Sequence, residues 1–136
     1  MTDCIFCKIV AEKLPCAKLL EDEAALAFLD IGPVVPGHAL LIPKRHHETV
    51  DQIPPDEAAA VFRHVPALAR AVRAATGATG VNVLQNNGRS ANQLVPHVHV
   101  HLIPRREGDT LRFNWPAGQY APGELDDMAK RIREGL

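Results

Sequence analysis

The segment His97-Val98-His99-Val100-His101-Leu102-Ile103 places a histidine at every second position. Successive side chains of a β-strand point to opposite faces, so an extended segment puts all three histidines on one face and the apolar residues on the other. The alternation predicts a strand over 97–103 that Pro104 ends. Packing does not explain three histidines on one face, and imidazole can act as nucleophile, proton donor or metal ligand near neutral pH.

Length and composition place this segment in a small globular protein. The chain has 136 residues, 46% hydrophobic and 23% charged, which fits one domain. A formal net charge of −1 argues against a nucleic-acid partner, and no apolar run approaches the ~20 residues needed to cross a membrane. The N-terminus lacks the pattern of a signal peptide, so we expect a cytoplasmic protein. An odd number of cysteines, three, argues against a disulfide framework.

Periodicity and turn residues predict the remaining elements. Apolar residues recur at three- and four-residue spacing over 54–75, which predicts one long helix with a kink at Pro66. A last amphipathic helix is expected from about residue 122. Short apolar runs bounded by Pro, Gly and acidic residues predict strands at 18–21, 24–29, 38–42, 81–84 and 97–103. The order of elements favours an α+β fold with a five-stranded antiparallel sheet.

The histidine run has the form His-apolar-His-apolar-His-apolar-apolar, and with its flanking segments it resembles the histidine triad (HIT) nucleotide-binding proteins, in particular single-domain bacterial members of the Hint branch. The resemblance implies one domain over 1–136, with a core of about 4–106 and a less similar tail at 107–136. It also implies a homodimer in which two sheets join into one. The other matching segments are Cys4-Ile5-Phe6-Cys7-Lys8-Ile9-Val10, Ala27-Phe28-Leu29-Asp30-Ile31, Pro36-Gly37-His38, Ile42-Pro43-Lys44-Arg45-His46 and Asn86-Asn87-Gly88.

The resemblance also implies catalytic roles. His99 would attack the α-phosphorus of a purine nucleotide and form a nucleotidyl-histidine intermediate that water resolves, and His101 would lie by the phosphate and leaving group. Asn86 and Gln93 match polar positions that contact the phosphate. Leu94 stands where many members carry a small hydroxyl residue, and this difference calls into question protonation of the leaving group through a hydroxyl.

The nucleoside has its own matching residues. Asp30 matches the acidic residue that binds the ribose hydroxyls, and a carboxylate can accept both hydrogen bonds from a diol. An apolar slot around the base would be formed by Ile5, Phe6, Ile9, Phe28 and Ile31. Core packing is the ordinary role of such apolar residues, and nucleotide pockets are themselves largely apolar.

Cys4-x-x-Cys7 suggests either a redox pair or half of a tetrahedral zinc site. A redox motif normally follows a strand in a βαβ unit, and no strand is expected before Cys4. The resemblance supplies His46 and His97 as two further ligands, which implies a structural zinc ion. Cys16 is interpreted as structural, and the remaining histidines, His38, His47 and His64, as surface, turn or core residues, with the role of His38 open.

Four functions are therefore in contention. The first is a hydrolase of nucleoside phosphoramidates or related phosphoanhydrides, and the second is a dinucleoside polyphosphate hydrolase. The third is a non-enzymatic nucleotide-binding module, and the fourth is a zinc-dependent structural domain. The structural domain would leave His99 and His101 unexplained, and a binding module would not need to keep His99. If His99 is the nucleophile, activity should fall below an imidazole pKa near ~6.5 when that pKa is unperturbed.

Overall fold

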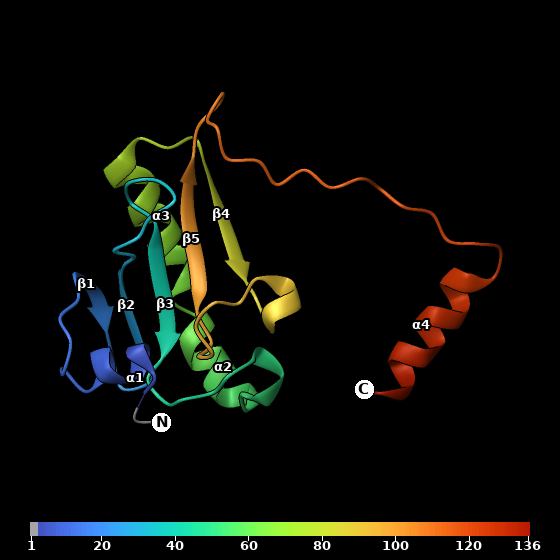
Figure 1. Cartoon of the computed structure of the whole chain (residues 1–136), viewed down its shortest axis with the longest axis horizontal. Helices are drawn as coiled ribbons and strands as arrows, with labels where there is room; N and C mark the ends of the chain where they lie inside the picture. Colours follow the sequence, from blue (N-terminus) through green and yellow to red (C-terminus); the bar gives the residue numbers. More distant parts are fainter. Residues whose placement is uncertain (1–2) are drawn as a thin grey trace.

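The structure is a computed structural model that describes residues 3–136. It contains a five-stranded antiparallel sheet with the spatial order β1-β2-β3-β5-β4 (Figure 1). No helix in residues 3–136 is long and apolar enough to cross a membrane. The elements are α1 (Ile5–Val10), β1 (Lys18–Glu21), β2 (Ala25–Leu29), β3 (Ala39–Pro43), α2 (Pro55–Phe62), α3 (Val65–Thr76), β4 (Gly80–Gln85), β5 (Val100–Arg105) and α4 (Glu124–Glu134), with 3-10 turns at Val50–Gln52 and Arg89–Ala91.

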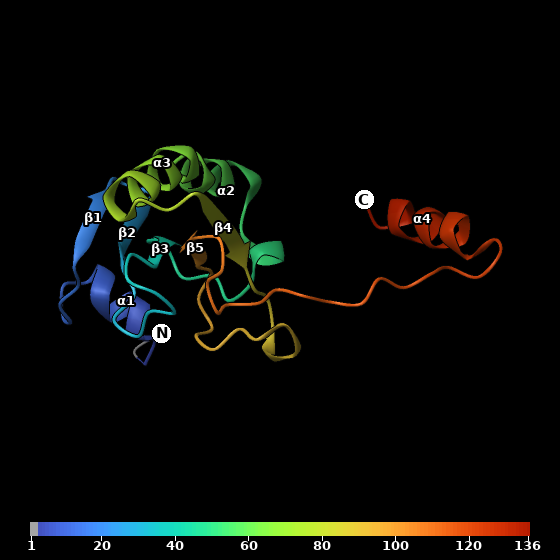
Figure 2. The ribbon, with the colours of Figure 1, turned by 90° about the horizontal axis from the view of Figure 1, so that it is seen from above.

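The sheet is covered on both faces. Helices α2 and α3 pack on one face, and α1 lies on the other (Figure 2). Alternating residues of β2 serve the two layers: Ala25 and Ala27 belong to the core under α2 and α3, whereas Leu26 and Phe28 belong to the core under α1. The central strands therefore bury both faces, and their apolar runs are nearly continuous for that reason.

The fifth strand differs from its prediction at both ends. It begins at Val100 instead of 97, and it runs through Pro104 to Arg105. β3 pairs with β5 only as far as Leu102, so Pro104 has a paired strand on one side only, which is β4. A proline is tolerated where only one side of a strand is paired. His97 and His99 lie in the segment that leads into β5, where ring and backbone hydrogen bonds hold them.

The predicted long helix is two helices. α2 ends at Phe62 and α3 begins at Val65, so Pro66 stands in the first turn of α3, where its missing N–H costs nothing. Asp22, in the β1–β2 turn, secures this break because Oδ2 accepts hydrogen bonds from Arg63 Nη2 and His64 Nε2, both at 2.7 Å. His64 is thus a satisfied structural histidine, as expected. Helix α1 was not foreseen by the periodicity analysis.

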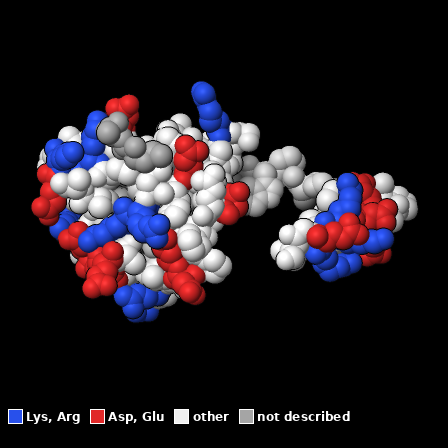
Figure 3. All heavy atoms as spheres, turned by 90° about the horizontal axis from the view of Figure 1, so that it is seen from below, with Lys and Arg blue, Asp and Glu red and all other residues white. Residues whose placement is uncertain are grey.

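The C-terminal helix was predicted correctly, and its placement is unusual. An extended segment follows β5 and leads to α4, which lies apart from the sheet (Figures 1 and 2). None of the residues of α4 is buried. Its surface carries both acidic and basic side chains (Figure 3). The assignment of residues 1–136 to a single domain stays a prediction.

Candidate active site

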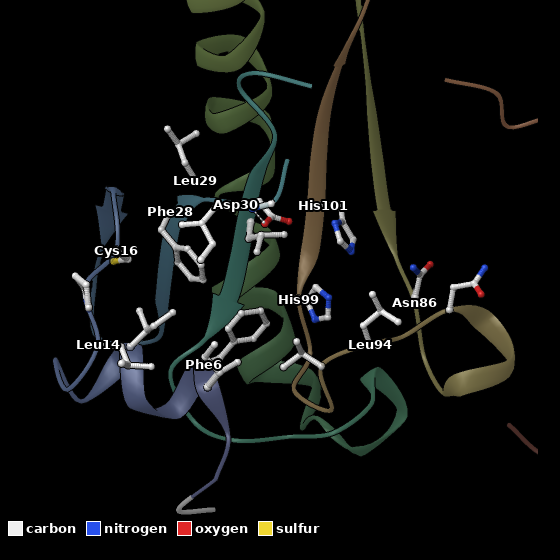
Figure 4. A pocket seen from close by; sticks show the side chains of 18 residues that line it. Phe6, Leu14, Cys16, Phe28, Leu29, Asp30, Asn86, Leu94, His99 and His101 are labelled. Atoms are coloured by element: carbon white, nitrogen blue, oxygen red, sulfur yellow. Dashed lines mark hydrogen bonds between the residues drawn. The ribbon is translucent and has the colours of Figure 1, made fainter. Parts of the chain in front are cut away.

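A cavity of about 610 Å³ opens between α1, the ends of β2 and β5, and the loop that follows β4. It brings together most of the residues expected at the site. Aromatic Phe6 and Phe28 lie on one side of His99, and Asn86 and Leu94 lie on the other (Figure 4). The lining also includes the expected Ile5, Ile9, Asp30, Ile31 and His101.

The apolar part of the cavity is anchored by α1. Phe6 is 6% exposed, and its ring meets Phe28 edge-on at 5.7 Å between centroids. The centroid of the same ring lies 5.7 Å from that of the His97 ring and 5.2 Å from that of the His99 ring. Ile31, in contrast, is 93% exposed and forms part of the rim. The inner end of the slot is therefore closely packed, and its outer end is open to solvent.

The hydrogen bonds of His99 define its tautomer. Nδ1 lies 2.7 Å from the backbone oxygen of His97, and a carbonyl oxygen can only accept, so Nδ1 carries the proton. The neutral ring then has its lone pair on Nε2. Burial lowers the pKa of His99, which favours this neutral form.

His101 is held by a chain of hydrogen bonds from the backbone. The Val34 N–H donates to Nδ1 of His38 at 3.1 Å, so the proton of a neutral His38 is on Nε2. That Nε2 donates to Nδ1 of His101 at 2.9 Å, which leaves the His101 proton on Nε2. Burial, reinforced by His99 and His38, lowers the pKa of His101 to about 4.

The interpretation of His38 as a surface or turn residue was wrong. The side chain is 3% exposed, and it lies against His101 with 5.1 Å between ring centroids. Asp30 is nearby, with 3.8 Å between its Oδ2 and His38 Nε2, so these three residues form a cluster of possible metal ligands. The proton on His38 Nε2 points toward His101, however, and the hydrogen bond between the rings accounts for the cluster without a metal.

The other predicted binding residues divide into two groups. Asp30 lines the cavity and holds the turn after β2 through a 2.8 Å hydrogen bond from the Gly32 N–H to Oδ1. Gln93 does not line the cavity: its Oε1 accepts from the Gly88 N–H at 2.7 Å, and its Nε2 donates to the Glu48 oxygen at 2.6 Å. The Gln93 side chain thus stabilises the loop after β4 through hydrogen bonds to backbone atoms of Gly88 and Glu48.

A second cluster lies beside the first, formed by Cys4, Cys7, His46 and His97. Its four ligand atoms all lie within 4.8 Å of one another. The sulfur–nitrogen distances are 3.4 Å from Cys4 to His97, 3.4 Å from Cys7 to His46 and 3.7 Å from Cys7 to His97, and the two Nδ1 atoms of the histidines are 3.2 Å apart. Zinc–ligand bonds of about 2.05 Å for nitrogen and about 2.3 Å for sulfur give tetrahedral edges of about 3.6 Å between S and N and about 3.4 Å between N and N.

The protonation pattern of this cluster also suits a cation. His97 Nε2 donates to the Pro43 oxygen at 2.8 Å, so Nδ1 presents a lone pair to the cluster. Burial, together with Cys4, raises the pKa of the Cys7 thiol to about 11, and a bound cation would reverse that shift by stabilising the thiolate. The four residues therefore fit a tetrahedral zinc ion.

The remaining predicted residues have structural surroundings. Cys16 lines the apolar part of the cavity near Leu14 and Phe28. His47 is not a free surface residue, because its side chain is 13% exposed and its Nε2 lies 3.0 Å from Oε1 of Glu57. Sequence reasoning missed Asn92 and Leu14 in the cavity lining. Asn92 sits in a left-handed conformation that its position in a polar loop could have suggested.

Comparison with known proteins decides the family. The sequence model of the HIT domain family matches residues 11–108 of the chain. The chain belongs to the HIT domain family. It is 43% identical to adenosine 5′-monophosphoramidase hnt1 of Schizosaccharomyces pombe, with 95% of each chain covered. It is 46% identical to adenylylsulfatase HINT3 of Arabidopsis thaliana over 80% of this chain, but it spans only 55% of the length of HINT3.

Solved structures of the family agree with the fold. A HIT family protein from Bacillus subtilis superimposes with a TM-score of 0.93 at 44% identity, covering 98% of this chain and 97% of the other. A zinc-bound histidine triad family protein from Mycobacterium smegmatis has a TM-score of 0.77 at 35% identity and covers 99% of both chains. The five-stranded antiparallel fold predicted for this HIT protein is confirmed.

Proposed function

We propose that this HIT protein hydrolyses purine nucleotide derivatives at the α-phosphate through a covalent nucleotidyl-His99 intermediate. The observation that carries the proposal is the tautomer of His99. Because Nδ1 donates to the His97 oxygen, the nucleophilic lone pair is on Nε2, in a ring that lines a nucleotide-sized cavity. The adenosine 5′-monophosphoramidase and adenylylsulfatase names of the relatives support a hydrolase of phosphoramidates or related phosphoanhydrides.

The first step joins His99 Nε2 to the α-phosphorus as the bond to the leaving group breaks. The ring becomes cationic in this adduct, and its Nδ1–H remains bonded to the His97 oxygen, which stabilises the developing positive charge. Water then attacks phosphorus from the vacated side and loses a proton to solvent, and the phosphorus–nitrogen bond breaks to return the neutral imidazole. The products are a nucleoside monophosphate and the leaving group.

The neighbouring side chains would orient the substrate. The Nε2–H of His101, fixed through His38, can donate to a non-bridging phosphate oxygen, and Asn86 can donate from the other side. Asp30 Oδ2 takes no part in the hydrogen bond from the Gly32 N–H and can accept hydrogen bonds from the ribose hydroxyls. The slot between α1 and β2 would take the purine, with Phe6 and Phe28 beside it.

The zinc site is structural in this proposal. Cys4, Cys7, His46 and His97 supply four protein ligands, so a bound zinc ion would have no open position for substrate or water. When bound, zinc would cross-link the start of α1 to the segments on which His46 and His97 lie. That link would hold Phe6 against His99.

A homodimer is part of the same proposal. β4 is an edge strand of the sheet, and its Val83 is 46% exposed. Pairing the edges of two copies would satisfy the open backbone groups and join the sheets. Sedimentation should give twice the chain mass at micromolar concentration, and a monomer there would contradict the dimer.

A substrate panel tests the enzymatic proposal. Adenosine phosphoramidates and diadenosine polyphosphates are incubated with the wild type and with His99→Ala, and nucleotide binding is measured in parallel. The proposal expects turnover of at least one adenosine derivative by the wild type, and binding without turnover by the variant. Fast turnover of diadenosine polyphosphates alone would favour the dinucleoside polyphosphate hydrolase. Binding without any turnover by the wild type would favour the binding module.

A further inference from the structure

The composition of the cavity wall sets a limit on the leaving group. Among the described residues that line the cavity, none carries a hydroxyl, ammonium or guanidinium group. The titratable lining groups are Cys16, Asp30, His99 and His101. Cys16 lies at the apolar end with Leu14 and Phe28, on the side away from Asn86 and Leu94 (Figure 4). In the proposed function Asp30 faces the ribose and His99 is the nucleophile, so His101 is the lining group left to supply a proton near phosphorus.

His101 is poorly suited to give that proton away. Its Nδ1 accepts from His38, and its one proton is on Nε2. Loss of this proton from a neutral ring would create an imidazolate beside His38 and His99, in a buried cluster that disfavours charge. His101 can therefore donate a hydrogen bond to a phosphate oxygen without delivering a proton to the leaving atom.

Leu94 lines the cavity on the side of His99 away from the apolar slot, where the leaving group of the proposed reaction would lie. It lies beside His99, on the side opposite Phe6 (Figure 4), and it is 91% exposed at the mouth of the cavity. With the base between Phe6 and Phe28, as proposed, the leaving group would extend past His99 toward this apolar side chain and solvent. Nothing in the side chain can assist the departure of a basic atom.

We propose that Leu94 makes the site selective for leaving groups that depart as stable anions, such as sulfate, over amines. This inference rests on the proposed function. With adenosine 5′-phosphosulfate, the bond from phosphorus to the bridging oxygen breaks, its electron pair leaves with the sulfate dianion, and no proton is required. With adenosine 5′-phosphoramidate, the phosphorus–nitrogen bond breaks only as nitrogen gains a proton, and that proton must come from solvent.

The test compares the two substrates within each protein, so that losses of folding or of active fraction cancel. The ratio of kcat/KM for adenosine 5′-phosphoramidate to that for adenosine 5′-phosphosulfate is measured for the wild type, Leu94→Ser and Leu94→Ala. General acid–base assistance is worth ~10²–10⁴-fold in rate. We expect a wild-type ratio of about 10⁻² or lower, and an increase of about a hundredfold in Leu94→Ser, at the low end of the same range. Leu94→Ala, which removes bulk without adding a hydroxyl, should leave the ratio within about threefold of the wild type.

A second readout reports proton donation directly. Adenosine 5′-aryl phosphates with phenols of graded acidity should show a steep dependence of rate on leaving-group pKa in the wild type, and a shallower one in Leu94→Ser. A wild-type ratio near or above one, or equal ratios for the Ser and Ala variants, would overturn the inference while leaving the proposed function intact. If the wild-type enzyme turned over neither substrate, the proposed function and this inference would be overturned together.

Discussion

Phe6 lies between the predicted zinc site and the proposed nucleophile His99, and its removal should affect both stability and substrate binding. The ring is 6% exposed and contacts Phe28, His97 and His99. Replacement of a buried Phe by Ala costs about 3–5 kcal/mol, and the low end applies here because the ring borders an open cavity. At about 2.1 cal/mol/K of unfolding entropy per residue, a loss of about 3 kcal/mol lowers the Tm by about 10 °C.

Phe113→Ala is the matched control for Phe6→Ala. Phe113 is 39% exposed, and its ring lies 5.4 Å from the Arg105 guanidinium carbon, a contact worth about 0.5–1 kcal/mol at an exposed site. Thermal unfolding of both variants with zinc present gives the stability comparison, and the KM for an adenosine substrate should rise only in Phe6→Ala. Equal Tm shifts in the two variants, or an unchanged KM in Phe6→Ala, would refute the role assigned to Phe6.

Three further results are expected. His38→Phe removes the donor to His101 Nδ1 and should lower kcat by about tenfold, with a smaller effect on KM. That loss corresponds to one hydrogen bond of about 1.5 kcal/mol. An unchanged kcat in steady-state assays would contradict the chain of hydrogen bonds. Cys7→Ser should lower zinc content by elemental analysis and lower the Tm more than it lowers kcat, and full retention of zinc would remove Cys7 from the ligands. The pKa of His101 is about 4 in the folded chain and near ~6.5 in the unfolded chain, so the unfolded state takes up the proton first as the pH falls. The His101 contribution to stability is therefore complete above about pH 6.5 and is lost as the pH drops toward 4. The acid limb of kcat/KM, which reports the free enzyme, should likewise lie below 6.5, and a limb centred at 6.5 would show that the pKa values of the essential histidines are not lowered.

The sequence was most informative where a periodic pattern directly reports burial. The alternation in 97–103 located β5, because side chains of a strand that share a face share an environment, and the continuous apolar run at 24–29 located β2, which is buried on both faces. The same alternation could not locate the start of β5, because pairing with β3 begins only at Val100 and leaves His97 and His99 outside the ladder. Strand pairing of that kind depends on residues far away in the chain.

Contacts between distant residues account for the other differences. His38 and His101 are separated by 63 positions, so their hydrogen bond and the tautomers that follow from it are visible only in the structure. Gln93 had the residue type of a phosphate ligand, but the loop that contains it turns the amide toward Gly88 and Glu48. Helix α1 has six residues and is too short to be stable alone, so the packing of Phe6 determines it more than its periodicity does.

The most direct test of the mechanism is to trap the intermediate on His99. Wild type and His99→Ala are mixed with a radiolabelled adenosine 5′-phosphate derivative, quenched and analysed by peptide mass spectrometry. A nucleotidyl adduct has an acid-labile phosphorus–nitrogen bond, so the quench is denaturant at alkaline pH, with an acid-treated aliquot as control. The proposed mechanism predicts an AMP adduct on the peptide that contains His99 in the wild type, its loss after acid treatment, and no adduct in His99→Ala. Turnover by the wild type with no adduct at any time point, or near-normal turnover by His99→Ala, would contradict covalent catalysis by this histidine.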